Sequence, residues 1–166
     1  MYHEMKFFGF AQDPIAQMPV IILKDAAGEK SVPIWISMAE SIAFAAELVG
    51  QELSLQRGRK GILELFLEKA TMKIELITIE SLHDGVFKTS ILFVGPDKEI
   101  RIEVQVSDAI TMALKCKMPV MVSDEVLQRA SSLDMRDESF TKESNARRFV
   151  DFLDNMDPSA MGKYPM

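Results

Sequence analysis

Hydrophobic and polar residues alternate along two stretches of the chain, and each stretch passes into a helical pattern. In residues 98–105 apolar side chains alternate with charged or polar ones, which predicts a strand. From Ser107 onward the apolar residues recur at helical spacing, and a serine followed by an acid favours the first turn of a helix. Residues 30–36 show the same strand pattern earlier in the chain. Ser37 and Glu40, which follow them, have the spacing of a capping box and predict a second helix start.

The two stretches align with each other residue by residue. Aligning Ile42 with Ile110 also aligns Glu40 with Asp108, so each stretch carries an acid beside a helix start at the end of a strand. This correspondence predicts that the chain is built from two similar units.

The remaining patterns predict the other elements of the two units. Hairpin turns at residues 25–29 and 82–85 make the sheet mainly antiparallel, so the predicted class is α+β. The prediction is a tandem pseudo-repeat of antiparallel strand–strand–strand–helix units, each with an additional helix, over about residues 5–70 and 72–131 of a domain spanning residues 1–132. The predicted strands cover residues 5–11, 19–24, 32–36, 72–79, 86–94, 98–105 and 118–122, and the predicted helices cover residues 37–50, 62–69, 107–114 and 123–130.

Residues 133–166 differ from the rest in composition. Residues 134–138 are highly charged and predict an exposed linker. A short C-terminal helix is predicted over residues 143–155, and the residues after it have little to pack and are expected to be loose. Docking of this helix on its own domain is favoured, and docking on a partner subunit is the main alternative. Its apolar stripe consists of Phe149, Phe152, Leu153 and Met156.

Composition limits the class of protein. The 166 residues are 48% hydrophobic, which is enough for a core and too many for a disordered chain. The formal net charge of −6 gives no overall attraction for nucleic acid. A single cysteine, Cys116, excludes an internal disulfide framework and suits a reducing compartment. With no signal-peptide pattern and no apolar run long enough to span a bilayer, we expect a cytoplasmic protein without membrane contact.

Three acids are the candidates for catalysis. Glu40 and Asp108 lie at the two aligned helix starts, and Asp84 lies in the turn before Gly85. If brought together, such carboxylates could hold Mg²⁺ or Mn²⁺ and activate water against a phosphodiester. The alternative is that each acid only caps a helix or serves a turn, and for any one of them this alternative is favoured.

Arg57, Arg59 and Lys60 form the densest basic spot. Together with basic residues of the predicted strands they could contact the phosphates of a nucleic acid. Ordinary solvated charge in a loop is the preferred alternative. The strand residues concerned are Lys73, Lys88 and Arg101.

The order and spacing of several motifs resemble the bifunctional nuclease domain family, which is widespread in bacteria and found in plants. The resemblance covers about residues 5–132, and residues 149–155 with Pro158 look like the tail of bacterial members. It implies an α+β domain, often dimeric, with nuclease activity on RNA and DNA. The motifs that carry it are residues 33–36, 40–43, 84–87, 107–110 and 119–122.

Two departures from the family pattern leave a second hypothesis open. Family members lead into the second helix with an Arg-Pro and then a Thr-His-Asp, whereas residues 56–61 here contain neither the histidine nor the aspartate. Family members often have an Arg-Pro before the Ser-Asp as well, and here Gln105 and Val106 occupy these positions. The first hypothesis is a metal-assisted nuclease, and the second is a non-catalytic dimeric binding or regulatory module. A homodimer is expected in either case, because the Met-rich apolar content and the aromatic tail helix offer spare hydrophobic surface.

Overall fold

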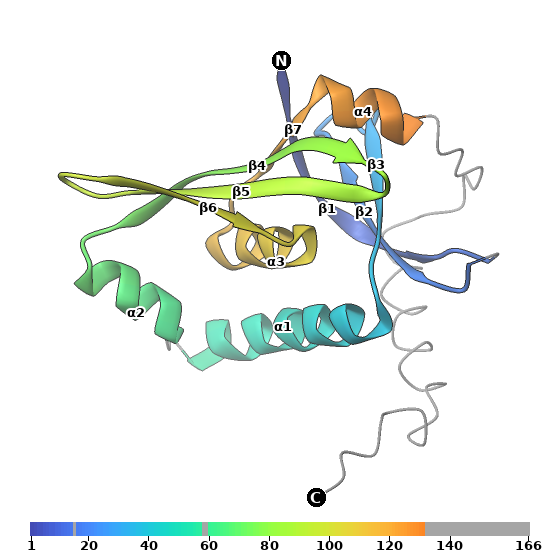
Figure 1. Ribbon diagram of the computed structural model, residues 1–166. Helices are drawn as coiled ribbons and strands as arrows, with labels where there is room; N and C mark the ends of the chain where they lie inside the picture. The colour runs from blue at the N-terminus through green and yellow to red at the C-terminus, as the bar shows by residue number, and fades with distance from the viewer. Residues whose placement is uncertain (15, 58–59, 132–166) are drawn as a thin grey trace, which may run out of the picture.

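The computed structural model describes residues 1–14, 16–57 and 60–131, and the predicted linker and helix at 134–155 lie outside this part. The described residues form seven strands and four helices in one mixed sheet-and-helix unit. This confirms the α+β class (Figure 1). The elements in chain order are β1 Tyr2–Gln12, β2 Pro19–Lys24, β3 Ser31–Trp35, α1 Met38–Arg57, α2 Ile62–Lys69, β4 Lys73–His83, β5 Val86–Val94, β6 Glu99–Val104, α3 Val106–Cys116, β7 Val120–Ser123 and α4 Asp124–Ser131.

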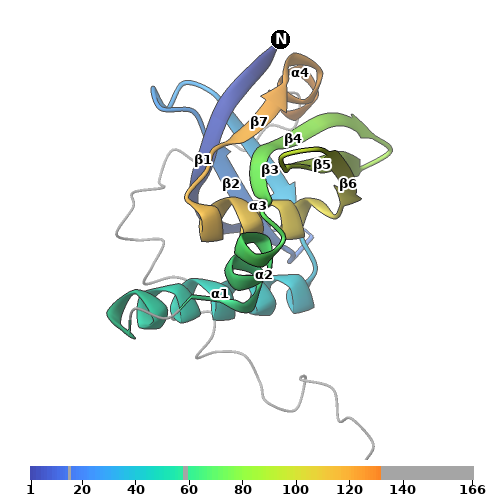
Figure 2. The same cartoon turned by 90° about the vertical axis from the view of Figure 1, so that its left-hand side faces the viewer.

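All seven strands belong to one sheet with the order β3-β2-β1-β7-β4-β5-β6. Every neighbouring pair is antiparallel except β4 and β7, which run parallel. β3 and β4 stand far apart in this order, yet both contact α4. The sheet is therefore strongly curled, with β1–β3 and β4–β6 as its two wings (Figure 2).

The hydrophobic core fills the inside of the curled sheet. The alternating strands turn one face inward, while β2, which is apolar at nearly every position, is buried along most of its length. Helices close the core: α4 packs on β3 and β4, and α3 packs on β4 and β5. The core includes Met5, Ile21, Leu23, Ile34, Phe44, Ile77, Ile79, Ile91, Ile110, Val122 and Val126.

Helix α1 lies outside α3, so that α3 is sandwiched between α1 and the sheet (Figure 1). Phe44 is the main side chain that anchors α1 to the sheet. Its ring centroid lies 5.2 Å from that of Phe7 and 5.1 Å from that of Phe10, both on β1. The Phe10–Phe44 pair is edge-on and the Phe7–Phe44 pair is tilted, and both arrangements avoid the unfavourable face-to-face stacking of rings.

Three local predictions are confirmed. Helix α2 has the predicted bounds, and the Asp84-Gly85 turn joins β4 to β5. Both turn residues have positive φ (50° and 78°), as a two-residue hairpin of type I′ requires. Ser123 caps α4, since its Oγ accepts a hydrogen bond from the Val126 N–H at 3.3 Å.

The predicted end of the first helix was wrong. The sequence indicated an end near Gly50, but α1 continues to Arg57. A single glycine inside a helix costs only about 1 kcal/mol relative to alanine, and good helix formers follow it. Consequently Arg57 belongs to a helix rather than to a basic loop.

Both halves of the chain contain three strands in an antiparallel meander followed by a helix. Their lengths differ, since α1 has 20 residues and α3 has 11. The second half also supplies β7, which has no counterpart in the first. The equivalence of the two halves therefore stays a prediction.

We expect Phe44→Ala to lower the free energy of unfolding by about 3–5 kcal/mol, because it removes a buried aromatic side chain and leaves a cavity. Phe44 is 1% exposed, whereas Phe66 on α2 is 64% exposed. Phe66→Ala is therefore the matched control and is expected to change stability by less than about 1 kcal/mol. Urea unfolding monitored by circular dichroism gives both values, and equal losses would contradict this account of the core.

Candidate functional site

The starts of α1 and α3 lie together, and a capping box fixes the first of them. The Ser37 N–H donates to Glu40 Oε2 at 2.7 Å, and the Glu40 N–H donates to Ser37 Oγ at 3.2 Å. These two bonds satisfy N–H groups that a helix start leaves without partners. The predicted capping role of Glu40 is thus confirmed.

Glu40 also reaches the start of the other helix. Ser107 Oγ, in the first turn of α3, donates to Glu40 Oε1 at 2.6 Å. Each carboxylate oxygen of Glu40 therefore accepts a hydrogen bond from a different helix start. One side chain joins two segments that are distant in sequence.

The hydrogen bonds keep Glu40 ionised. Burial alone would raise its pKa, but the bonds from Ser107 and Ser37 outweigh burial and lower the pKa below its ordinary value. A carboxyl group of this kind is a poor proton donor at neutral pH. It is well suited to holding a hydroxyl group and a helix start in place.

Asp108 follows Ser107 and is exposed in the first turn of α3. Its carboxylate is thus on the solvent side of the point where α1 and α3 meet, one residue from the Ser107–Glu40 contact. Asp84 is also exposed, but in the β4–β5 turn. The structure therefore links the Glu40 and Asp108 segments and leaves Asp84 in a separate turn.

The three acids do not form a ready metal site. Among the residues that the structure describes, no group of three or more His, Cys, Asp or Glu side chains is placed to hold a metal ion. Both oxygens of Glu40 are already engaged by protein donors. The described carboxylates thus do not fit a preformed three-carboxylate centre, and a requirement for Mg²⁺ or Mn²⁺ stays a prediction from the sequence.

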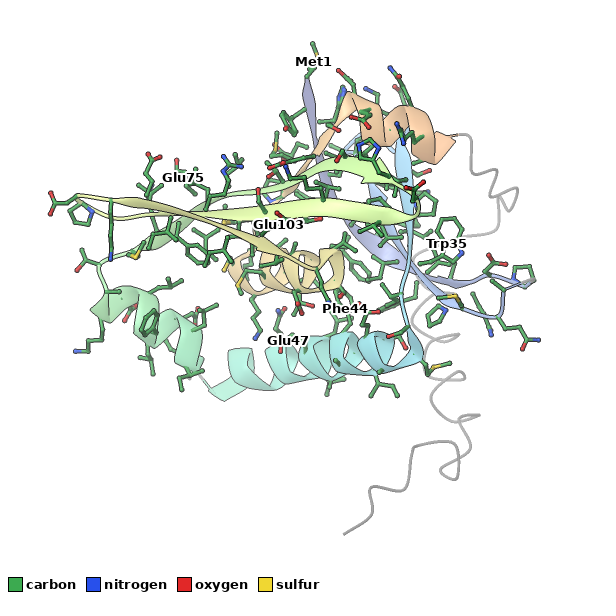
Figure 3. All side chains as sticks on the ribbon, viewed as in Figure 1. Met1, Trp35, Phe44, Glu47, Glu75 and Glu103 are labelled. Carbon is green, nitrogen blue, oxygen red and sulfur yellow. The ribbon has the colours of Figure 1, made fainter. Side chains whose placement is uncertain are left out.

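A second contact joins α1 and α3 farther toward their C-terminal ends. Glu47 of α1 points toward α3 (Figure 3), and Lys115 Nζ lies 3.2 Å from Glu47 Oε2. Because Glu40 meets Ser107 and Glu47 meets Lys115, the two helices run parallel. A partly exposed ion pair of this kind stabilises weakly, by about 0–1 kcal/mol, and mainly fixes the alignment.

The basic side chains that the sequence suggested for phosphate binding are paired with acids wherever the structure describes them. Lys60 forms an ion pair with Glu68, and this hydrogen bond is the main cause that raises the pKa of Lys60. On the sheet, Lys73 lies 2.6 Å from Glu75. The side chain of Arg57 and all of Arg59 lie outside the described part, so the predicted basic spot is seen only at Lys60.

Glu80 forms ion pairs with the other two basic strand residues, Lys88 and Arg101. It lies 3.4 Å from Lys88 and 3.2 Å from Arg101, and it accepts a hydrogen bond from Ser90 Oγ at 2.9 Å. The bond from Ser90 contributes most to lowering the pKa of Glu80, and the two cations add to the effect. Glu80 thus offsets one of the two positive charges that the sequence suggests for phosphate binding.

The hydrogen bond from the hydroxyl group of Ser107 to Glu40 is not predicted by the sequence. The pattern around Ser107 predicts only a helix start. The alignment of Glu40 with Asp108 contained a signal, because it placed the two helix starts in equivalent positions. The alignment did not indicate that Glu40, at the start of α1, would contact the start of α3.

We expect Glu40→Gln to reduce the free energy of unfolding by about 1–2 kcal/mol at pH 7, since it removes a charged cap and weakens the bond to Ser107. The folded state lowers the pKa of Glu40, so this stabilisation is present above the unfolded-state pKa and is lost as the pH falls through the folded-state pKa. The difference between variant and wild type should therefore shrink in urea titrations below about pH 4.

Glu64→Gln is the matched control for this prediction. Glu64 forms a comparable capping contact with the Gly61 N–H at 3.0 Å, but on the exposed helix α2. The control should cost less than Glu40→Gln at pH 7. Equal losses in the two variants would show that the bond to the second helix adds nothing.

Comparison with known proteins gives the family of the chain. Two proteins of Mycobacterium tuberculosis, the uncharacterized proteins MT1877 (strain CDC 1551 / Oshkosh) and Rv1829 (strain ATCC 25618 / H37Rv), are each 29% identical over 160 residues, covering 93% of this chain and 95% of theirs. The family model described as Bifunctional nuclease domain matches residues 21–134, which is more than half of the chain and includes both helix starts. The chain therefore belongs to the bifunctional nuclease domain family.

Proposed function

We propose that the protein is a nuclease that hydrolyses phosphodiester bonds in RNA and DNA. The observation that carries this proposal is its membership of the bifunctional nuclease domain family over residues 21–134. The junction of α1 and α3, which lies within these residues, is the proposed location of the chemistry.

In this proposal Asp108 is the catalytic group and Glu40 is a positioning residue. An exposed carboxylate in the first turn of a helix can accept a proton from a water molecule that attacks phosphorus. The N–H groups at a helix start favour the negative charge of the phosphoryl group. Glu40 contributes by holding Ser107, and with it the start of α3, in a fixed position.

Asp84 is retained as a third candidate acid on sequence grounds. The proposal also includes a requirement for Mg²⁺ or Mn²⁺, because such an ion can activate the water that hydrolyses a phosphodiester bond. The described carboxylates alone give too few ligands, so phosphate oxygens and water would have to complete the coordination of any ion.

A second candidate function is a non-catalytic binding or regulatory module on the same scaffold. The engagement of both Glu40 oxygens favours it, because that side chain is then a structural link rather than an open ligand. The pairing of Lys60, Lys88 and Arg101 with acids also leaves less charge for nucleic acid. A homodimer is proposed under either function, since apolar side chains are exposed on α2 and β6.

We expect Asp108→Asn to reduce the rate of RNA and DNA cleavage by about 100-fold or more, as the loss of a general base does. Purified protein is incubated with labelled single- and double-stranded substrates and Mg²⁺, Mn²⁺ or EDTA. Glu29→Gln, an exposed acid in the turn between β2 and β3, is the matched control and should retain the wild-type rate. If wild type and Asp108→Asn cleave at the same trace rate, the cleavage is a contaminant and the nuclease proposal fails.

We expect Arg57→Gln combined with Arg59→Gln to weaken binding of single-stranded RNA and to make it less sensitive to salt. Each lost phosphate contact should reduce the slope of log K against log salt concentration by about 0.7. Lys88→Gln is the control, because Lys88 is paired with Glu80. An unchanged slope in the double variant, measured by fluorescence anisotropy, would exclude this basic spot from binding.

A further inference from the structure

Strand β6 is an open edge of the sheet. It stands last in the strand order, and no described element lies beyond it (Figure 2). Ile100 is 37% exposed and Ile102 is 45% exposed, and the whole strand contains no proline. An exposed edge of this length is a template for another strand.

The opposite edge, β3, is protected in two ways. Pro33 interrupts its hydrogen-bonding capacity, and α4 packs against it. The β3 edge is therefore protected against pairing with another strand, whereas the β6 edge is not. A strand that pairs with β6 has to match its backbone hydrogen-bonding groups and its charges.

The hairpin before β6 shows which of its backbone groups face outward. The Gly95 N–H donates to the Lys98 carbonyl at 2.9 Å, so these two residues form a hydrogen-bonded pair. Such pairs alternate along an antiparallel ladder. With the regular register between β5 and β6, Ile102 therefore bonds to β5, while the N–H and C=O groups of Arg101 and Glu103 point away from it.

We propose that β6 pairs antiparallel with β6 of a second copy of the chain, with the two-fold axis at Ile102. In this register Arg101 lies opposite Glu103 of the second copy, and Glu103 lies opposite its Arg101. Both residues have outward-facing backbone groups, so the ladder hydrogen bonds can form. Ile102 lies opposite itself, and Ile100 lies opposite Val104.

Charge complementarity distinguishes this register from its neighbours. An axis at Arg101 would place Arg101 opposite itself and Glu99 opposite Glu103. An axis at Ile100 would keep an opposite-charge pair, Arg101 with Glu99, but would place Glu103 opposite Asp97 and Ile102 opposite Lys98. Like charges directly opposite each other destabilise a pair of strands, whereas opposite charges stabilise it. Of the three registers, the one at Ile102 therefore places opposite charges together, pairs Ile100 and Ile102 with apolar residues, and puts no like charges opposite each other.

The contacts that Arg101 already makes are compatible with this pairing. Its Nη1 donates to Glu80 Oε1 at 3.2 Å and to Ser90 Oγ at 3.0 Å. Both bonds use the same nitrogen, and a guanidinium group has three. Lys88 also neutralises Glu80, so Arg101 can share its charge with a second carboxylate.

This inference rests on the proposed homodimer and adds its surface and register. It does not depend on nuclease activity. The pairing would join two seven-stranded sheets and cover the exposed isoleucines of β6. It needs no residue outside the described part of the chain.

Cross-linking of single-cysteine variants tests the register. In a Cys116→Ala background, Ile102→Cys should form a disulfide-linked dimer on mild oxidation, because directly opposite residues in such pairs have Cα atoms about 4.5–5.5 Å apart. Ile100→Cys and Arg101→Cys are matched controls that report the other two registers. In the proposed register the two Ile100 positions are offset by about 13 Å and cannot be bridged.

Light scattering of reduced protein tests the association itself. We expect a dimer at tens of micromolar, and Glu103→Lys should raise the dissociation constant about tenfold because both charge pairs become repulsive. Glu99→Lys is the control, since Glu99 lies opposite Gln105 and should leave the constant nearly unchanged. Circular dichroism checks that each variant folds.

The outcomes separate the two proposals. A monomeric wild type would overturn the homodimer and, with it, this pairing. A dimer that cross-links at Ile100 or Arg101 but not at Ile102 would overturn the register. A dimer that cross-links at none of the three would place the interface elsewhere, for example on the exposed apolar residues of α2, and would overturn the edge pairing.

Discussion

The carboxylate of Glu40 is the constraint on which the arrangement of the outer helices depends. Parallel helices bring two positive dipole ends together at their starts, which is unfavourable unless negative charge lies between them. Glu40 supplies that charge to both helices and fixes their separation through hydrogen bonds with Ser37 and Ser107. The Glu47–Lys115 contact then only has to maintain the alignment.

This link also explains why α3 can serve as the inner layer. Its buried face, which includes Ala109, Ile110 and Ala113, packs toward the sheet. Small residues there allow close approach, and α1 covers the outside. The junction is thus held by hydrogen bonds on its protein side and exposed at Asp108 on its solvent side.

The sequence predicted the elements whose signals are local. Ser37 with Glu40 predicted the start of α1, and Asp84-Gly85 predicted a hairpin, because each depends on backbone groups only a few residues away. The sequence failed where distant segments decide the result. The Ser107–Glu40 bond and the parallel pairing of β4 with β7 are examples. Of the candidate site, the two helix starts with Glu40 and Asp108 were predictable, whereas the pairing of Lys60 and Lys88 with acids was not.

The position of β7 has a consequence for how the chain is made. This strand comes near the end of the described residues, yet it lies in the middle of the sheet, between β1 and β4. The two wings share no direct strand pairing without it. A ribosome must therefore deliver almost the entire domain before the sheet can close, and until then each wing exposes an edge that its own chain has yet to fill.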